Sequence, residues 1–103
     1  MNAWNKNVDE IITQTLKKLG ISIIDKVITD KKLEYVLLKN ETMISLSYTM
    51  EKAYDFMVVD DDTMKITYST TEFNIEPQML SEQVIKDAFQ LVEGGLNNDI
   101  PRI

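Results

Sequence analysis

The sequence predicts an α+β protein: one helix, an antiparallel meander of about five strands, and a second helix. Two patterns carry this prediction. Apolar residues recur at almost every second position between residues 33 and 70, and they recur at helical spacing near each end of the chain. A sheet with one apolar face can be sealed by two helices that each have an apolar side. We therefore expect a two-layer sandwich with both helices on one face of the sheet.

Length and composition fit a single domain, residues 1–103. Hydrophobic residues make up 44% of the chain, and 103 residues suffice for a core of its own. There is no cysteine, so disulfides are excluded, which agrees with a reducing compartment. No apolar run is long enough to cross a bilayer, and the N-terminus lacks the apolar stretch of a signal peptide. We expect a cytoplasmic protein with no membrane contact.

The first element is a predicted helix over residues 8–19. Asn7 precedes it as a candidate N-cap, with Glu10 three residues later as in a capping box. Gly20 suits the left-handed position after the helix, which would fold Ile21 back onto Leu16. The side expected to face the core consists of Val8, Ile11, Ile12, Thr15, Leu16 and Leu19.

The pattern of residues 21–29 predicts a strand in which apolar and polar residues alternate imperfectly. If Ile21, Ile23 and Val27 face inward, Asp25 does too, whereas the opposite choice buries Lys26. A bulge would resolve the conflict, and the pattern does not locate it.

The four strands that follow are joined by turns whose length must keep the apolar set on one face. The predicted turns are Asn40-Glu41, Glu51-Lys52-Ala53 and Asp60-Asp61-Asp62. The first pairs Leu37 with Ile44, Tyr35 with Leu46, and Leu33 with Tyr48. The third pairs Val58 with Met64, Phe56 with Ile66, and Tyr54 with Tyr68.

A short strand at 73–75 and a second helix over residues 81–94 complete the chain. Ser81 is the expected N-cap, with Leu80 packed on Ile85, and Gly94-Gly95 is the expected end before a loose tail, 96–103. The apolar arc of this helix is wide enough to make its edge, at Ile85 and Phe89, a secondary candidate surface. Its members are Val84, Ile85, Ala88, Phe89, Leu91 and Val92.

Composition excludes most catalytic chemistry. Without histidine or cysteine there is no Ser-His-Asp triad, no Cys-His nucleophile and no structural zinc site, and no glycine-rich loop could bind phosphate. We predict no catalytic residue, no metal ligand and no cofactor. An enzyme would have to place Lys26 or two acids in a deep pocket, drawn from Glu51, Asp55, Glu72 and Glu76.

Two clusters allow a functional and a structural interpretation, and we favour the structural one in both. Asp60-Asp61-Asp62 could bind a divalent cation, but aspartate is also common in solvated turns. Aromatic side chains could stack nucleic-acid bases, but the alternation places them in the core, and the net charge of −6 argues against binding phosphates directly. These aromatics are Tyr35, Tyr48, Tyr54, Tyr68 and Phe56.

The outer face of the sheet holds the main candidate site. Its predicted apolar island consists of Val36, Leu38, Met43, Met57 and Val59. Glu34 and Asp55 would form a charged rim. Contiguous exposed apolar residues mark partner surfaces, although the tail or the 73–75 segment could instead cover them.

These observations favour a non-enzymatic protein-binding module: a small inhibitor, an immunity factor or a phage-encoded modulator. Its partner would be another protein or a second copy of itself. An acidic decoy that occupies a nucleic-acid-binding groove is the alternative, and a small carboxylate enzyme is the second alternative. Ten of the 11 basic residues are lysine, a bias typical of a low-GC bacterium or its phage.

Overall fold

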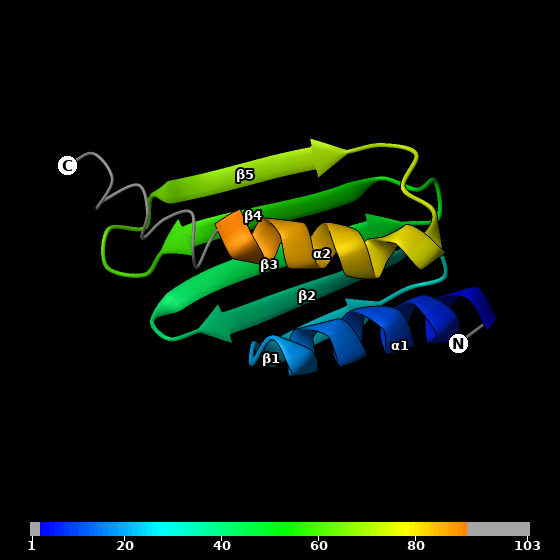
Figure 1. The fold of residues 1–103 in the computed structure, drawn as a ribbon, viewed down its shortest axis with the longest axis horizontal. Helices are drawn as coiled ribbons and strands as arrows, with labels where there is room; N and C mark the ends of the chain where they lie inside the picture. Colours follow the sequence, from blue (N-terminus) through cyan, green and yellow to red (C-terminus); the bar gives the residue numbers. More distant parts are fainter. Residues whose placement is uncertain (1–2, 91–103) are drawn as a thin grey trace.

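The computed structural model describes residues 3–90 and shows one helix, a five-stranded antiparallel meander and a second helix. Figure 1 shows both helices on the same face of the sheet, which confirms the predicted α+β sandwich. The strands lie in the order β1-β2-β3-β4-β5. The elements are α1 (Ala3–Lys18), β1 (Ser22–Ile28), β2 (Lys32–Lys39), β3 (Thr42–Thr49), β4 (Tyr54–Asp60), β5 (Ile66–Glu72), the 3₁₀ turn η1 (Pro77–Met79) and α2 (Leu80–Phe89).

Helix α1 begins earlier than predicted. Asn7 and Glu10 lie inside the helix, so the predicted N-terminal capping box is wrong. The added turn is anchored by Trp4, which packs against the core, and by buried Asn5, whose Nδ2 donates to the Thr29 carbonyl. The end of α1 agrees with the prediction.

Gly20 ends α1 in the left-handed conformation, with φ of 71°. The Ile21 N–H donates to the Leu16 carbonyl at 3.0 Å, and the Gly20 N–H donates to the Lys17 carbonyl at 3.2 Å. These two bonds satisfy carbonyls that the helix leaves free, and they fold the chain back toward the sheet. The predicted C-cap is confirmed.

Strand β1 contains the expected bulge, located at Ile24. The pairing with β2 shifts between Ile23 and Asp25, and the shift exchanges the faces of the residues that follow. Ile23 and Ile28 pack against the core, whereas Val27 is exposed, so neither proposed alternation holds along the whole strand. Lys26 lies opposite Tyr35 on the helix side.

The β2–β3 turn matches the prediction. Leu37 lies opposite Ile44 and Tyr35 opposite Leu46, and Asn40 takes a positive φ of 59°.

The β3–β4 turn is displaced by one residue from its predicted position. The Thr49 N–H donates to the Ala53 carbonyl, so the turn residues are 50–52 and Tyr48 faces Tyr54. The displacement changes the pairing and leaves every side chain on its predicted face.

The predicted β4–β5 turn is wrong. Residues 61–65 separate the two strands, and a second bulge follows at Thr67 of β5, which has no partner between the pairs Val59–Ile66 and Val58–Tyr68. Tyr68, rather than Met64, therefore lies opposite Val58, and Ile66 lies opposite Val59 on the outer face. The reason is local: Asp60 Oδ1 accepts the backbone N–H groups of Asp62 and Thr63, which stabilises a longer turn.

No strand forms at residues 73–75. Phe73 is exposed, Ile75 is buried, and the chain passes through η1 into α2. Ser81 lies within α2 and is not its N-cap, and Leu80 is the first residue of the helix. The expected helix end at Gly94-Gly95, the tail at 96–103, and Leu91 and Val92 lie outside the described residues.

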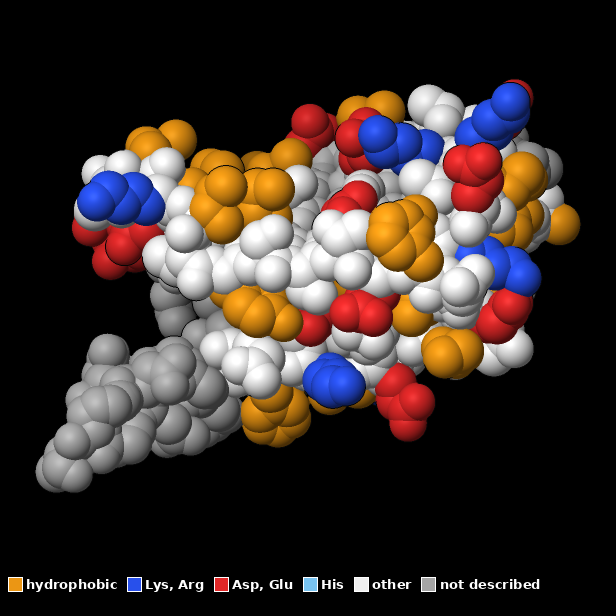
Figure 2. All heavy atoms as spheres, turned by 90° about the horizontal axis from the view of Figure 1, so that it is seen from above, with side chains coloured by type: hydrophobic (Ala, Val, Ile, Leu, Met, Phe, Trp, Pro, Cys, Tyr) orange, Lys and Arg blue, Asp and Glu red, His pale blue; other side chains and the backbone are white. Residues whose placement is uncertain are grey.

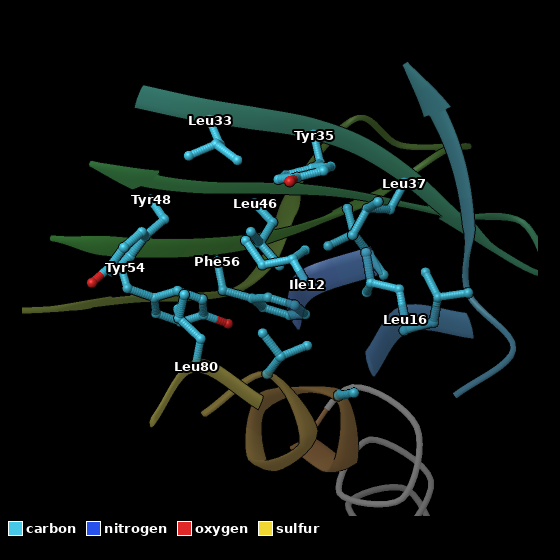
Figure 3. Packing of buried hydrophobic residues seen from close by; sticks show 14 of the residues in the cluster. Ile12, Leu16, Leu33, Tyr35, Leu37, Leu46, Tyr48, Tyr54, Phe56 and Leu80 are labelled. Carbon is cyan, nitrogen blue, oxygen red and sulfur yellow. The ribbon is translucent and has the colours of Figure 1, made fainter. Parts of the chain in front are cut away.

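The core lies between the two layers. Figure 3 shows side chains of β2, β3 and β4 pointing toward both helices. The side of α1 predicted to face the core does so, with Val8, Ile12 and Leu16 fully buried. The buried hydrophobic residues of the sheet are Leu33, Tyr35, Leu37, Ile44, Leu46, Tyr48, Tyr54, Phe56 and Val58. The alternation therefore predicted the inner face of the three central strands correctly.

Candidate functional site

The outer face of the sheet carries a row of hydrophobic residues at one end. Leu38 lies opposite Met43, Met43 opposite Val59, and Val59 opposite Ile66, so the row crosses β2 to β5. Directly opposite residues on one face are close enough for their side chains to touch. Leu38 is 36% exposed and Ile66 is 58% exposed, so the row is open to solvent at both ends.

A second row, two residues further along each strand, contains Val36, Ser45 and Met57 in order. Val36 is exposed and Met57 is partly buried. The two rows together form one surface, which we call the outer-face patch. Its members are Val36, Leu38, Met43, Met57, Val59 and Ile66.

The next row along the strands is polar. Glu34 lies opposite Ser47, and Ser47 lies opposite Asp55, so both predicted rim acids adjoin the outer-face patch on the same side. Asp55 accepts a hydrogen bond from Thr71 Oγ1 at 2.6 Å, and Glu34 pairs with Lys32 at 3.2 Å. The patch therefore has an apolar centre and, along one border, a row of exposed acids whose side chains are oriented by neighbours.

All seven residues predicted for the site lie on the outer face. The structure adds Ile66, which the alternation had placed in the core. Its new position follows from the bulge in the β4–β5 hairpin, and no hydrophobic pattern reports a bulge. The one available signal was Asp60 before two further aspartates, because an aspartate side chain can hold a longer turn.

The tyrosines belong to the core, as we favoured. Tyr35, Tyr48 and Tyr54 are at most 1% exposed, and Trp4 stacks on Tyr48. Burial, and secondarily Glu76, raises the pKa of Tyr48 to about 12, and the Tyr48 hydroxyl donates to the Ile75 carbonyl. Rings held in this way are not available to stack on bases.

Two buried or partly buried carboxylates tie the helices to the sheet. Asp9 of α1 accepts from the Tyr35 hydroxyl at 2.7 Å and from Lys26 Nζ at 3.1 Å. Burial raises the pKa of Asp9, but these two hydrogen bonds, the charge of Lys26 and a hydrogen bond from Thr13 together leave the pKa below its usual value. Asp87 of α2 accepts from the Tyr68 hydroxyl at 2.9 Å. Both networks connect layers, and each acid is already engaged by the protein.

The residues considered for catalysis do not converge. Lys26 is paired with Asp9, Glu76 is paired with Lys52 at 2.6 Å, and Asp55 lies on the outer face. Among the surface hollows within residues 3–90, two contain neither Lys26 nor any of the four acids. They are lined by Met79, Glu82, Gln83, Ile85 and Lys86, and by Ala3, Lys6, Asn7 and Glu10.

Asp60-Asp61-Asp62 forms a turn stabilised by its own backbone bonds, which supports the structural interpretation. In the described part of the chain, no group of three acids gathers in a way that could hold a metal ion.

At the secondary candidate surface, on α2, Phe89 is 57% exposed and Ile85 is partly buried.

No protein-family model, curated protein or solved structure matches this chain. Within residues 3–90, neither helix has the length and apolar character needed to cross a membrane.

Proposed function

We propose that this chain is a non-enzymatic protein-binding module that docks through the outer-face patch. The observation that carries the proposal is the hydrophobic row Leu38–Met43–Val59–Ile66, on the face of the sheet opposite both helices. The core is already enclosed between the inner face of the sheet and the two helices, so these outer-face residues contribute little to it. An apolar row kept on a solvent-facing sheet is typical of an interaction surface.

The border of the patch defines the chemistry of the partner. Its centre offers methionine and branched aliphatic side chains, which adapt to varied apolar surfaces. Glu34 and Asp55 lie on one border, so a complementary partner presents apolar side chains beside basic ones. A small inhibitor, an immunity factor or a phage-encoded modulator acting in the cytoplasm would fit this description.

The arrangement of the acids favours this proposal over an acidic decoy of nucleic acid. A decoy needs carboxylates spaced along one surface, as phosphates are spaced along a strand. Here Asp87 is buried, Asp9 is paired with Lys26 beneath α1, and Ser47 separates Glu34 from Asp55. Binding through an apolar centre is expected to depend weakly on salt, whereas binding by a decoy would weaken steeply as salt is added.

The test uses Met57→Lys in the full-length chain, with Met50→Lys as the matched control. Met50 is 45% exposed in the β3–β4 turn, outside the patch. We expect a partner captured from the source cell by the parent protein to be lost with Met57→Lys and retained with Met50→Lys. Circular dichroism and thermal unfolding verify that both variants fold.

Mass spectrometry identifies the captured protein, and a titration between low and high salt measures the affinity of the purified pair. Equal capture by the parent and Met57→Lys would show that the patch is not the docking site. A steep loss of affinity with salt would favour the decoy.

A further inference from the structure

The two edges of the sheet differ in how well they are protected. At the β1 edge, Ile24 forms a bulge and Lys26 lies opposite Tyr35. Alternate residues of a strand form backbone hydrogen bonds to opposite sides. The backbone of Tyr35 bonds to β3 and therefore not to β1. The N–H of Lys26, opposite Tyr35, consequently points to the free edge. That N–H donates to Asp25 Oδ1 at 2.9 Å. A bulge and a self-satisfied N–H are devices that block further strand pairing.

Strand β5 has its bulge at Thr67, near its start, and from Tyr68 to Glu72 its free edge has none of these devices. Its sequence, Ile-Thr-Tyr-Ser-Thr-Thr-Glu, favours strands and contains neither proline nor lysine. Neither helix lies over it in Figure 1. Figure 2 looks onto this side of the molecule and shows hydrophobic side chains set among white atoms, with acidic and basic side chains between them and at both ends.

The hydrogen-bond pattern identifies which backbone groups of β5 are unpaired. Thr49 bonds to Ala53 across the β3–β4 turn, so the next residue of β4, Tyr54, directs its backbone toward β5. The same alternation directs Thr70 and Tyr68 toward β4 and leaves the N–H and C=O groups of Ser69 and Thr71 pointing outward. Within residues 3–90 no side chain bonds to these outward groups.

We propose that β5 pairs antiparallel with β5 of a second copy of this chain, which joins two five-stranded sheets into one. The register that uses every outward group places Ser69 opposite Thr71 of the other copy, and Thr71 opposite its Ser69. A two-fold axis perpendicular to the sheet then passes beside Thr70. This symmetry keeps both outer-face patches on the same side of the joined sheet.

The two ends of β5 are complementary, which favours a second copy over an unrelated strand. Lys65 precedes the strand and Glu72 ends it, so antiparallel pairing directs the positive end of one copy toward the negative end of the other. Antiparallel pairing also brings the hydrophobic side chains at one end of β5 toward those at the other end of β5 in the second copy. Met64, Ile66 and Phe73, at 68%, 58% and 68% exposure, are the most exposed large hydrophobics among residues 3–90, and they flank β5 at its two ends.

Protection of β1 makes the assembly a closed dimer. If both edges were open, copies could add to each other without limit and form a fibre. With only β5 open, the contact is between identical surfaces and is complete after two chains. The proposed dimer therefore satisfies an edge that would otherwise invite aggregation.

The first test is the mass of the full-length chain by sedimentation equilibrium, in the parent, Ser69→Pro and Ser69→Ala. Proline removes an outward N–H and leaves the bonds to β4 intact, whereas alanine keeps the N–H. We expect twice the chain mass for the parent and Ser69→Ala, and a single chain mass for Ser69→Pro. A monomeric parent at millimolar concentration, or a dimeric Ser69→Pro, would overturn the proposal.

The second test needs no variant and so does not depend on how proline affects folding. Amide hydrogen exchange of the parent is followed by NMR at high and low protein concentration. We expect the Ser69 and Thr71 amides to exchange more slowly on concentration, while the amides of Tyr68 and Thr70, already bonded to β4, do not change. Equal exchange of Ser69 and Thr71 at both concentrations would contradict the pairing. Met57 lies on β4 directly opposite Ser69, so the mass of Met57→Lys is measured as well. Because this variant keeps the outward N–H and C=O groups of Ser69 and Thr71, we expect it to lose the partner and remain a dimer, which separates the two results.

Discussion

Replacing Leu46 by alanine is expected to lower the free energy of unfolding by about 3 kcal/mol, within the range measured for buried leucines. Leu46 is fully buried in the central strand, on the face that both helices cover. Truncation removes buried methyl groups and leaves a cavity that the surrounding sheet and helices fill only in part. Urea unfolding at neutral pH, monitored by circular dichroism, gives the difference.

Leu38→Ala is the matched control for this prediction, since it deletes the same atoms from the neighbouring strand on the outer face. Leu38 is 36% exposed and lies under neither helix, so we expect a loss below about 1 kcal/mol. Similar losses for the two variants would mean that the outer face is as buried as the inner one. That result would remove the basis of the outer-face patch.

The second large effect is alkaline unfolding, driven by tyrosines that the fold keeps neutral. Burial raises the pKa of Tyr35, Tyr48 and Tyr54 above the ordinary value of 10.0. The next largest cause is a hydrogen bond to Asp9 for Tyr35, and the charge of a nearby acid for Tyr48 and Tyr54. The unfolded chain ionises these phenols near pH 10, while the folded protein retains their protons. Stability is therefore fully present below pH 10 and is lost as the pH rises above it.

The expected slope is steep. Each such tyrosine lowers the free energy of unfolding by about 1.4 kcal/mol per pH unit, so the three together lower it by at most about 4 kcal/mol per unit. The free energy of unfolding of a natural domain is about 5–15 kcal/mol in total, so unfolding is expected to begin within a few pH units above 10. Tyrosinate absorbance at alkaline pH should then appear in one step, together with the loss of circular dichroism.

Tyr35→Phe supplies the control, because it removes one retained proton and keeps the ring. We expect a shallower loss of stability above pH 10 for this variant. The same change removes a donor from Asp9, which should raise the pKa of that carboxyl toward its usual value. Independent titration of all four tyrosines near pH 10, with the circular dichroism unchanged, would contradict the prediction.

The elements that the sequence predicted well are those in which one local pattern acts alone. The inner faces of β2, β3 and β4 follow from alternation, since side chains on a strand point to opposite faces at a period of two. The end of α1 follows from Gly20, where a left-handed conformation suits glycine. All seven residues of the predicted site lie on the outer face for the same reason, because they alternate with the buried set.

The elements that it missed depend on competition between local patterns and distant contacts. The local sequence favours Asn7 as an N-cap, but packing of Trp4 and burial of Asn5 extend α1 toward the N-terminus. The local sequence also favours Ser81 as an N-cap, but its hydroxyl accepts a hydrogen bond from Thr15 of α1. In each case a residue with a strong local preference was recruited by a tertiary contact.

By itself the sequence determined that one face of this sheet is apolar and that two helices are available to cover it, because hydrophobic periodicity is a property of the chain alone. Only the tertiary structure decided that the bulges lie at Ile24 of β1 and Thr67 of β5, and with them that Ile66 joins the outer face and that β5 keeps an open edge between Tyr68 and Glu72. A bulge exchanges the faces of all later residues in its strand, and its position depends on backbone hydrogen bonds to a neighbouring strand. No pattern within a single strand contains that information.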